Sequence, residues 1–196
     1  MELAGRLAVV KASGTAVAMT AEATTATGNI SYQITDATKR VIDRTEAVVV
    51  KDGGVVTAEA YTLNRLSGTV TFATATARTI TIDGKYLPMA EVASAHEYSF
   101  NKAVDVLEVT PFAATHKKRI AGQKFASGTL SQWDINEYFY DALTADEPIV
   151  LEFRGTATGE PERLWAYLES SEMSAAISDP QNEIVTFTST DELLNI

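Results

Sequence analysis

Apolar and polar positions alternate with a period of two along much of the chain, which predicts β-strands. The clearest region runs from residue 46 to residue 88. Its apolar positions fall at 48–50, 55–56, 61 and 63, 70 and 72, and 80 and 82. Asp-Gly pairs supply the positive φ angles of tight hairpins, so we expect turns at Asp52-Gly53 and Asp83-Gly84. The region is typical of a β-meander.

One segment has the helical period instead. Its apolar residues are spaced i, i+3, i+4 and i+7, and they are Ile135, Tyr138, Phe139 and Ala142. Ser131 followed by Asp134 resembles a capping box, and Leu130 with Ile135 occupies the hydrophobic-staple positions. The pattern predicts one short α-helix at about residues 131–144.

The remaining segments complete a chain of antiparallel strands. Strand patterns cover residues 3–11, 16–24, 30–34, 91–101, 104–109, 120–125, 149–154, 164–173 and 184–188. Ser127-Gly128 is expected to close the strand at 120–125. The charged residues 36–45 are expected to form a loop or a sheet extension, anchored by Val41 and Ile42. We predict a mainly β fold, an antiparallel β-sandwich or partly closed barrel with one helix. Residues 1–196 are expected to form one domain, with an elaborated meander at residues 1–90.

The amino-acid composition excludes some classes of binding site and some cellular locations. The chain has 196 residues and no cysteine, which excludes disulfides and thiolate metal sites. Its start, MELAGRLAVV, lacks the features of a secretion signal. No stretch approaches the roughly 20 apolar residues of a membrane span. We expect a soluble protein made in a cytoplasm.

Charge is distributed unevenly along the sequence. The net charge is −10, yet residues 1–124 hold 14 Lys and Arg against 12 Asp and Glu, whereas residues 125–196 hold 2 against 14. A strongly acidic segment repels phosphates, which disfavours ordinary nucleic-acid binding. A solvated acidic surface is the simplest interpretation.

Motifs for catalysis and for cofactor or metal binding are not found. His96 and His116 have no second ligand at metal-binding spacing. The sequence has neither a GxSxG elbow nor a phosphate-binding glycine loop. A two-carboxylate hydrolase stays open as the third hypothesis. Its candidate acids are Asp134, Glu137, Asp141 and Glu152. We therefore predict no catalytic residue, no cofactor and no metal.

Aromatic residues keep a sugar-binding β-sandwich open as well. The residues that could stack on sugar rings are Trp133, Tyr138, Tyr140 and Trp165. Packing in the core or at an interface would explain the same residues.

The order of elements in the second half resembles the tail tube (major tail) proteins of long-tailed bacteriophages. The resemblance begins with Tyr98 and the strand Val104-Asp105-Val106-Leu107-Glu108-Val109-Thr110-Pro111-Phe112, followed by a basic loop and Arg119-Ile120-Ala121-Gly122. It continues through Ser127-Gly128-Thr129, the helix, the strands at 149–154 and 164–174, and Val185-Thr186-Phe187. In the first half, YTLNRLSGTVTF at residues 61–72 resembles phage structural proteins.

The resemblance implies a structural subunit rather than an enzyme. Such proteins form rings, commonly of six, whose inner sheets join into one barrel, and the rings stack into a tube. The implied partners are further copies of the chain, the tape-measure protein, and terminator and tip proteins; DNA is present only in transit, and no membrane is involved. The implied location is the phage tail within the virion. The alternative is a β-sandwich binding module, for carbohydrate or in another part of the virion.

The family also implies a loop or hairpin that reaches the adjacent ring. The candidates are the loop with Lys39, Arg40, Asp43 and Arg44, and the hairpin with Asp52 and Gly53. The cluster Lys117, Lys118 and Arg119 is expected either to pair with acids on a neighbouring subunit or ring or to form an exposed solubilising loop. In a tube, carboxylates of the last third would line the bore and repel DNA.

Overall fold

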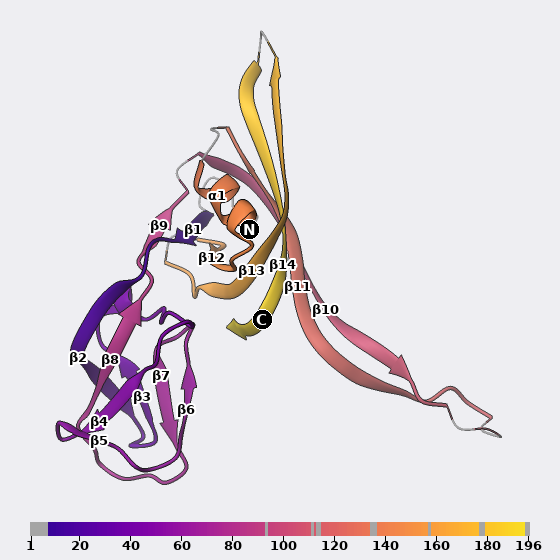
Figure 1. Ribbon diagram of the computed structural model, residues 1–196. Coiled ribbons are helices and arrows are strands. Elements are labelled where there is room, and N and C mark those ends of the chain that lie inside the picture. The colour runs from indigo at the N-terminus through magenta and orange to yellow at the C-terminus, as the bar shows by residue number, and fades with distance from the viewer. Residues whose placement is uncertain are drawn as a thin grey trace. The chain divides into compact units, whose positions relative to one another are not determined.

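The structure is a computed structural model that describes residues 8–92, 94–110, 112, 115–133, 137–156, 158–176 and 179–194. The chain forms two compact units (Figure 1). Unit 1 comprises Met1–Val10 and Val92–Ile196, and unit 2 comprises Lys11–Glu91. Two seven-stranded sheets dominate, with one α-helix in the described residues. This confirms the predicted fold class; a single domain over residues 1–196 stays a prediction.

Unit 2 is built on the sheet ordered β5-β4-β8-β2-β3-β7-β6. The recorded strand pairs in it are antiparallel. Its elements are β2 (Val17–Thr27), β3 (Ser31–Ile34), the 3-10 helix η2 (Ala37–Lys39), β4 (Val49–Asp52), β5 (Val55–Val56), β6 (Tyr61–Asn64), β7 (Thr69–Phe72) and β8 (Ile80–Tyr86). The predicted strands are therefore present, but the predicted meander is wrong: β5 and β6 lie at opposite edges of the sheet, and β8 pairs with β4 and β2 rather than with β7.

The core of unit 2 consists of the inward positions of these strands. Its buried members are Met19, Tyr32, Ile34, Ile42, Val50, Val70, Phe72, Ile80 and Ile82. The rings of Tyr32 and Phe72 meet edge to face with centroids 5.8 Å apart, a favourable aromatic arrangement. The predicted anchors of the charged loop are buried too, since Val41 and Ile42 are 1% and 0% exposed.

The two predicted Asp-Gly turns have different outcomes. The hairpin at Asp52-Gly53 is confirmed, because Gly53 and Gly54 have φ angles of 58° and 86° between β4 and β5. The turn at Asp83-Gly84 is wrong, since both residues lie inside β8. There, Oδ1 of Asp83 accepts a hydrogen bond from the backbone N–H of Ala21. Ala21 has a φ of 50° and lies at a register irregularity of β2. Asp83 therefore caps a bulge of the neighbouring strand.

Unit 1 is built on the sheet ordered β10-β11-β14-β13-β12-β1-β9. The strands of this sheet are β1 (Val9–Ser13), β9 (Met89–Glu91), β10 (Ala95–Glu108), β11 (Arg119–Gln132), β12 (Ile149–Arg154), β13 (Glu162–Ala176) and β14 (Asp179–Leu194), and α1 (Glu137–Ala145) belongs to the same unit. β9 and the end of β1 fall within the residues of unit 2. The chain leaves unit 1 within β1 and returns after β9, and these two strands pair antiparallel. The strands predicted separately at 91–101 and 104–109 are one strand, β10.

Aromatic rings from distant strands form the core of unit 1. Phe153 of β12 lies 5.3 Å from Phe100 of β10 and 5.5 Å from Phe187 of β14, measured between ring centroids. Phe139 of α1 is fully buried, as the predicted apolar stripe requires. These rings pack against one another and so connect β10, β12 and β14 across the core.

The start of the predicted helix is corrected by the structure. Ser131 is not an N-cap, because it belongs to β11 and pairs with Glu97 on one side and Ile184 on the other. The neighbouring strands satisfy its backbone groups, which leaves no reason for a helix to begin there. Asp134 and Ile135 lie outside the described residues, and α1 is described from Glu137 onward.

Gly128 is also corrected, because it does not end a strand. It lies within β11 between Phe100 of β10 and Phe187 of β14. A Cβ at this position would lie 2.1 Å from the carbonyl oxygen of Ser99 and 2.8 Å from Cζ of Phe187. The glycine is needed for close packing inside the sheet rather than for a turn.

Candidate assembly surfaces

A long two-stranded ribbon extends from the sheet of unit 1, and we call residues 102–126 the arm (Figure 1). β11 pairs with β14 only over Ser127 to Gln132, whereas it pairs with β10 from Arg119 onward. Over residues 102–126, no third strand pairs with the ribbon in the described part of the chain. An isolated two-stranded ribbon is at best marginally stable in water.

Large apolar side chains of the arm are exposed. They are Val104 (42% exposed), Val106 (60%), Leu107 (55%), Val109 (40%), Phe112 (105%) and Ile120 (46%). Val104 and Val106 share one face because side chains alternate along a strand. Leu107 and its cross-strand partner Ile120 lie on the opposite face. Both faces of the arm thus carry exposed apolar side chains, whereas Ala126 at its base is buried.

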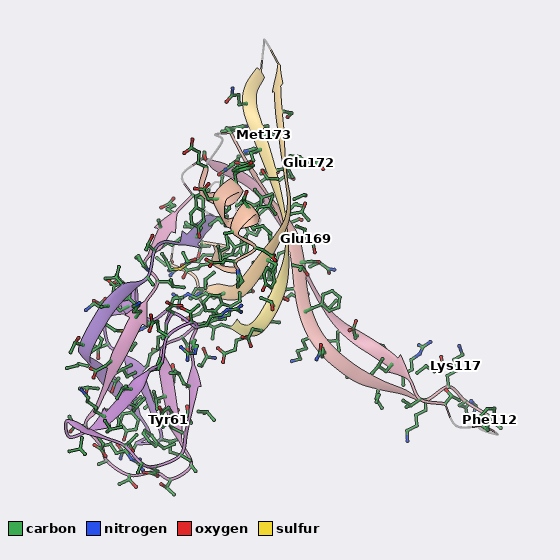
Figure 2. All side chains as sticks on the ribbon, viewed as in Figure 1. Tyr61, Phe112, Lys117, Glu169, Glu172 and Met173 are labelled. Atoms are coloured by element: carbon green, nitrogen blue, oxygen red, sulfur yellow. The ribbon has the colours of Figure 1, made fainter. Side chains whose placement is uncertain are left out.

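The arm also carries an excess of positive charge. Residues 102–126 contain five Lys and Arg residues and two Asp and Glu residues. Lys117 lies 3.4 Å from the carboxylate of Glu108 in the same arm. The side chains of Lys118, Arg119 and Lys124 are exposed and form no ion pair with any described residue. The predicted basic cluster is therefore at the outer part of a strand pair, near Phe112 (Figure 2).

A second strand pair, formed by β13 and β14, carries exposed acids; we call its described residues 169–176 and 179–186 the acidic hairpin. Glu169 and Glu172 are exposed, and neither has an ion-pair partner in the described part of the chain. Met173 beside them is 57% exposed (Figure 2). These three residues were not predicted from the sequence, because exposed side chains on a long strand form no recognisable sequence motif.

A buried polar network fixes the base of the acidic hairpin. Glu183 of β14 is 1% exposed. Its carboxylate accepts hydrogen bonds from Nε2 of Gln132 at 2.5 Å and from Oγ of Ser171 at 2.6 Å. These bonds join β11, β13 and β14 at the point where β11 ends, so a satisfied buried network holds the emerging hairpin in place.

The other predicted contact residues lie in unit 2 and are engaged there. Nζ of Lys39 donates to Glu22 at 2.6 Å, and this hydrogen bond raises the pKa of Lys39. Nε of Arg40 donates to the carbonyl of Ile34 at 2.9 Å. The carboxylate of Asp43, 9% exposed, accepts from the N–H of Thr45 at 2.9 Å.

The predicted contact residues of the β4–β5 hairpin are also engaged within unit 2. Oδ1 of Asp52 accepts from the N–H of Thr79 at 3.0 Å, and Gly53 occupies the turn described above. Arg44 is half-buried. The structure thus divides the predicted contact residues: six belong to unit 2, and Lys117, Lys118 and Arg119 belong to unit 1.

Catalytic arrangements are not found in the described residues. No group of three or more His, Asp or Glu residues there is placed to hold a metal ion. Of the four acids proposed for a hydrolase, Glu137 and Asp141 are exposed on α1 and Asp134 lies outside the described residues. Glu152 is 1% exposed and bound by two arginines. In the described chain, no helix has both the length and the apolar character to cross a bilayer.

A shallow depression of about 370 Å³ lies where β10, β11, β13 and β14 adjoin. Its polar lining includes Ser99, Asn101, Thr129 and Glu169. Oγ of Ser99 and Oγ1 of Thr129 lie 2.8 Å apart and hydrogen bond to each other. One carboxylate among hydroxyl and amide groups is not the carboxylate pair of a glycosidase.

Comparisons with known proteins give a partial structural likeness. The structure titled "Tail of empty GTA particle computed with helical refinement, C6 symmetry" has a TM-score of 0.47 and 11% identity, over 55% of this chain and 85% of that chain. A virion of a native gene transfer agent particle has a TM-score of 0.46 and 12% identity, over 54% of this chain and 86% of that chain. Likeness at this level does not define a function. No family model matches the sequence, and no curated protein does.

Proposed function

We propose that the chain is a structural subunit of a phage tail tube, without catalytic activity. Copies form rings, six to a ring, and the rings stack into a channel through which the genome passes. The proposal rests on the sequence resemblance described above and on the arm. The partners are other copies, the tape-measure protein, and the proteins that terminate and tip the tail.

The arm carries this proposal. Four of its exposed apolar side chains, Val104, Val106, Leu107 and Ile120, lie on the two faces of the ribbon, and Val109 and Phe112 are exposed beyond the end of β10. Fully burying one such side chain is worth about 1.5–3 kcal/mol, so burying their exposed parts is worth on the order of 5 kcal/mol. An exposed apolar surface of this kind marks a site of protein association. In a stacked assembly, neighbouring copies would cover both faces of the ribbon.

The edge of the sheet supports the same function. β10 is the outermost strand of the unit 1 sheet. An outermost strand presents unpaired backbone N–H and C=O groups, and natural proteins either protect such an edge or use it for pairing. In a ring, the edge of one subunit joins the sheet of the next.

The charge distribution suits a conduit for DNA. Residues 125–196 contain 14 acidic and 2 basic residues. We propose that some of these carboxylates face the bore, because a negative wall repels phosphate and keeps DNA from adhering. A bore that proved neutral or basic in an image of the assembled tube would contradict this part of the proposal.

Electron microscopy of the purified protein at high concentration tests the function. Rings or tubes of even bore are expected from the wild type. Leu107→Asp places a charge on the apolar face of the arm and is expected to prevent assembly, because a buried unpaired charge is costly. The matched control is Ile30→Asp between β2 and β3, where the isoleucine is 39% exposed, and this variant should assemble as the wild type does. A wild type that stays monomeric at all concentrations would contradict the proposal.

A sugar-binding module is the second candidate. Trp133 and Tyr140 are each 57% exposed, as stacking on a sugar ring would require. The ring of Trp133 already stacks on His96 with centroids 4.4 Å apart, and Trp165 is 3% exposed in the core. Retarded migration in polysaccharide gels, lost in Trp133→Ala, would favour this candidate over the tube.

A further inference from the structure

We infer that residues 14–88 are an inserted module that folds independently, and that self-assembly requires unit 1 alone. We call residues 14–88 the insertion. They comprise unit 2 except for the end of β1 and the strand β9, which lead into it and out of it. The inference rests on the proposed self-assembly and assigns that function to one of the two units.

The strands that lead into and out of the insertion are paired with each other. β1 and β9 run antiparallel, and Ser13 lies opposite Met89. Beyond this pair, the N–H of Gly14 donates to the carbonyl oxygen of Pro88 at 2.7 Å. Opposed residues of an antiparallel pair have Cα atoms about 5 Å apart, a gap that a two-residue turn can connect. The insertion therefore stands where a simple hairpin needs only a turn.

The insertion has a core of its own. Nine buried side chains form one cluster, and all of them lie between Met19 and Ile82 in the sequence. Tyr32 in this cluster is 1% exposed, and its hydroxyl donates to the carbonyl oxygen of Thr76 at 2.7 Å. The insertion is 75 residues long. Many domains of about 60 residues fold alone, so this length and this core are sufficient for independent folding.

The charged groups of the insertion neutralise one another. It contains seven Lys and Arg and seven Asp and Glu. Five of its acids form ion pairs with Lys or Arg of the insertion, and they are Glu22, Asp36, Glu46, Glu59 and Asp83. The other two, Asp43 and Asp52, accept hydrogen bonds from the backbone N–H groups of Thr45 and Thr79. Every carboxylate side chain of the insertion is therefore engaged within it.

The features that support the tube function lie outside the insertion. The rest of the chain has 9 of the 16 Lys and Arg and 19 of the 26 Asp and Glu, so it accounts for the whole net charge of −10. The arm also belongs to unit 1. Exposed large apolar residues of the insertion are divided among β2, the β2–β3 connection and β5, and they are Val17, Ile30, Val55 and Val56. The acidic charge and the apolar ribbon are thus both properties of unit 1.

The inference has two consequences for the predictions made from the sequence. Residues 1–196 would form two domains rather than one. Six of the predicted contact residues would not be required for assembly, because they lie in the insertion: Lys39, Arg40, Asp43, Arg44, Asp52 and Gly53. The cluster at residues 117–119 keeps its predicted role, because it lies in unit 1.

Paired core substitutions in the full chain test independent folding. Ile82→Ala removes a fully buried side chain of the insertion, and amide hydrogen exchange in β3, β7 and β8 should become about a hundredfold faster. The urea midpoint followed by tryptophan fluorescence should not move, because both tryptophans are in unit 1. Phe153→Ala in unit 1 is the matched control. It should lower that midpoint by about 1 M or more and leave exchange in the insertion unchanged.

A loss that passed from one unit to the other in these variants would overturn independent folding. A change confined to the unit that carries the substitution supports it, since independent units show additive effects.

Excision then tests which unit assembles. In the shortened chain, Asn-Gly replaces residues 14–88 and connects Ser13 to Met89 through a two-residue turn. This chain should unfold cooperatively at the wild-type midpoint and form rings or tubes of the wild-type bore in electron microscopy. Leu107→Asp in the shortened chain should prevent assembly, as in the full chain. A shortened chain that is unfolded, or that stays monomeric where the wild type assembles, would overturn the inference.

The insertion by itself provides the complementary measurement. Residues 14–88 alone should unfold cooperatively and should remain monomeric in sedimentation velocity. They should not sediment with wild-type tubes. An unfolded fragment would contradict independent folding, and a fragment that bound the tubes would show that the insertion contributes an assembly contact.

The outcomes separate this inference from the proposed function. Wild-type tubes together with a shortened chain that does not assemble would overturn the inference and leave the tube function in place. A wild type without any self-association would contradict the tube function. In that case the paired core substitutions would still decide whether the insertion folds independently.

Discussion

The ion-pair network around Glu152 allows a quantitative prediction for the stability of unit 1. Glu152 of β12 lies opposite Arg163 of β13. Its Oε2 accepts from Nε of Arg163 at 2.6 Å, and its Oε1 accepts from Nε of Arg154 at 2.7 Å. The side chains of Glu152 and Arg163 are 1% and 7% exposed, whereas that of Arg154 is 23% exposed. The Glu152–Arg163 pair is therefore nearly free of solvent.

Removing one partner of this pair should be far more harmful than removing both. Arg163→Met takes a buried cation from a buried carboxylate and is expected to destabilise unit 1 by about 3–5 kcal/mol. Glu152→Leu should have a similar effect, because it leaves Arg163 buried without its carboxylate. The double variant removes both charges together and should lie within about 2 kcal/mol of the wild type, since no buried charge loses its counterion. Arg154 can turn toward water because it is partly exposed.

Urea unfolding followed by tryptophan fluorescence measures these differences. Both tryptophans of the chain, Trp133 and Trp165, lie in unit 1, so the signal reports that unit. Trp165 is 3% exposed and pairs with Val150 of β12, next to the ion pair. Additive losses in the double variant would refute the reasoning, because they would show that Glu152 and Arg163 stabilise the fold independently.

The same network predicts how stability depends on pH. Burial by itself would raise the pKa of Glu152, but Arg163 and Arg154 outweigh it and hold the pKa below its ordinary value of 4.5. The carboxylate therefore stabilises the fold above about pH 4.5, and this contribution is lost as the pH falls through the lower folded-state pKa. The stability gap between the wild type and Glu152→Gln should be widest at neutral pH and narrow in acid. A gap that stayed constant down to acid unfolding would contradict this assignment.

Two further substitutions test packing in each unit. Gly128→Ala should lower the free energy of unfolding by about 2–3 kcal/mol in the tryptophan assay, because the new Cβ would lie 2.1 Å from the carbonyl oxygen of Ser99. The control Gly155→Ala should lower it much less, because the space around Gly155 is open. Arg78→Ala should destabilise unit 2, because it removes an ion pair of 2.6 Å to Glu59 by a side chain that is itself 4% exposed. Amide hydrogen exchange in β7 and β8 measures the second loss, and unchanged protection there would contradict it.

The period-two pattern was sufficient to predict the strands of unit 2. Alternating positions such as Val70 and Phe72, or Ile80 and Ile82, became its core as expected. Local composition failed where long-range pairing decides the conformation. Asp83-Gly84 has the sequence of a turn, yet it lies within β8 because the carboxylate caps a bulge in β2, 62 residues earlier in sequence.

The assembly surfaces were less predictable, for a similar reason. The basic residues at 117–119 are a visible cluster, and the structure places them on the arm. The acidic hairpin has no comparable signal, because Glu169 and Glu172 are ordinary solvent-facing acids until the register shows where they lie. A strand pattern does not reveal which sections of a strand extend beyond their neighbours. That depends on the relative lengths of β11 and β14, which are set by pairing across the sheet.

The arm shows how an apolar pattern can describe an assembly rather than one chain. Val106 and Leu107 are consecutive, so they occupy opposite faces, and apolar residues on both faces are typical of a strand that is buried on both sides. In the single chain they are 60% and 55% exposed. A strand that repeatedly exposed both faces to water would be a hazard for aggregation. The sequence of the arm is therefore consistent with a fold whose packing is completed by other copies, as the proposed function requires.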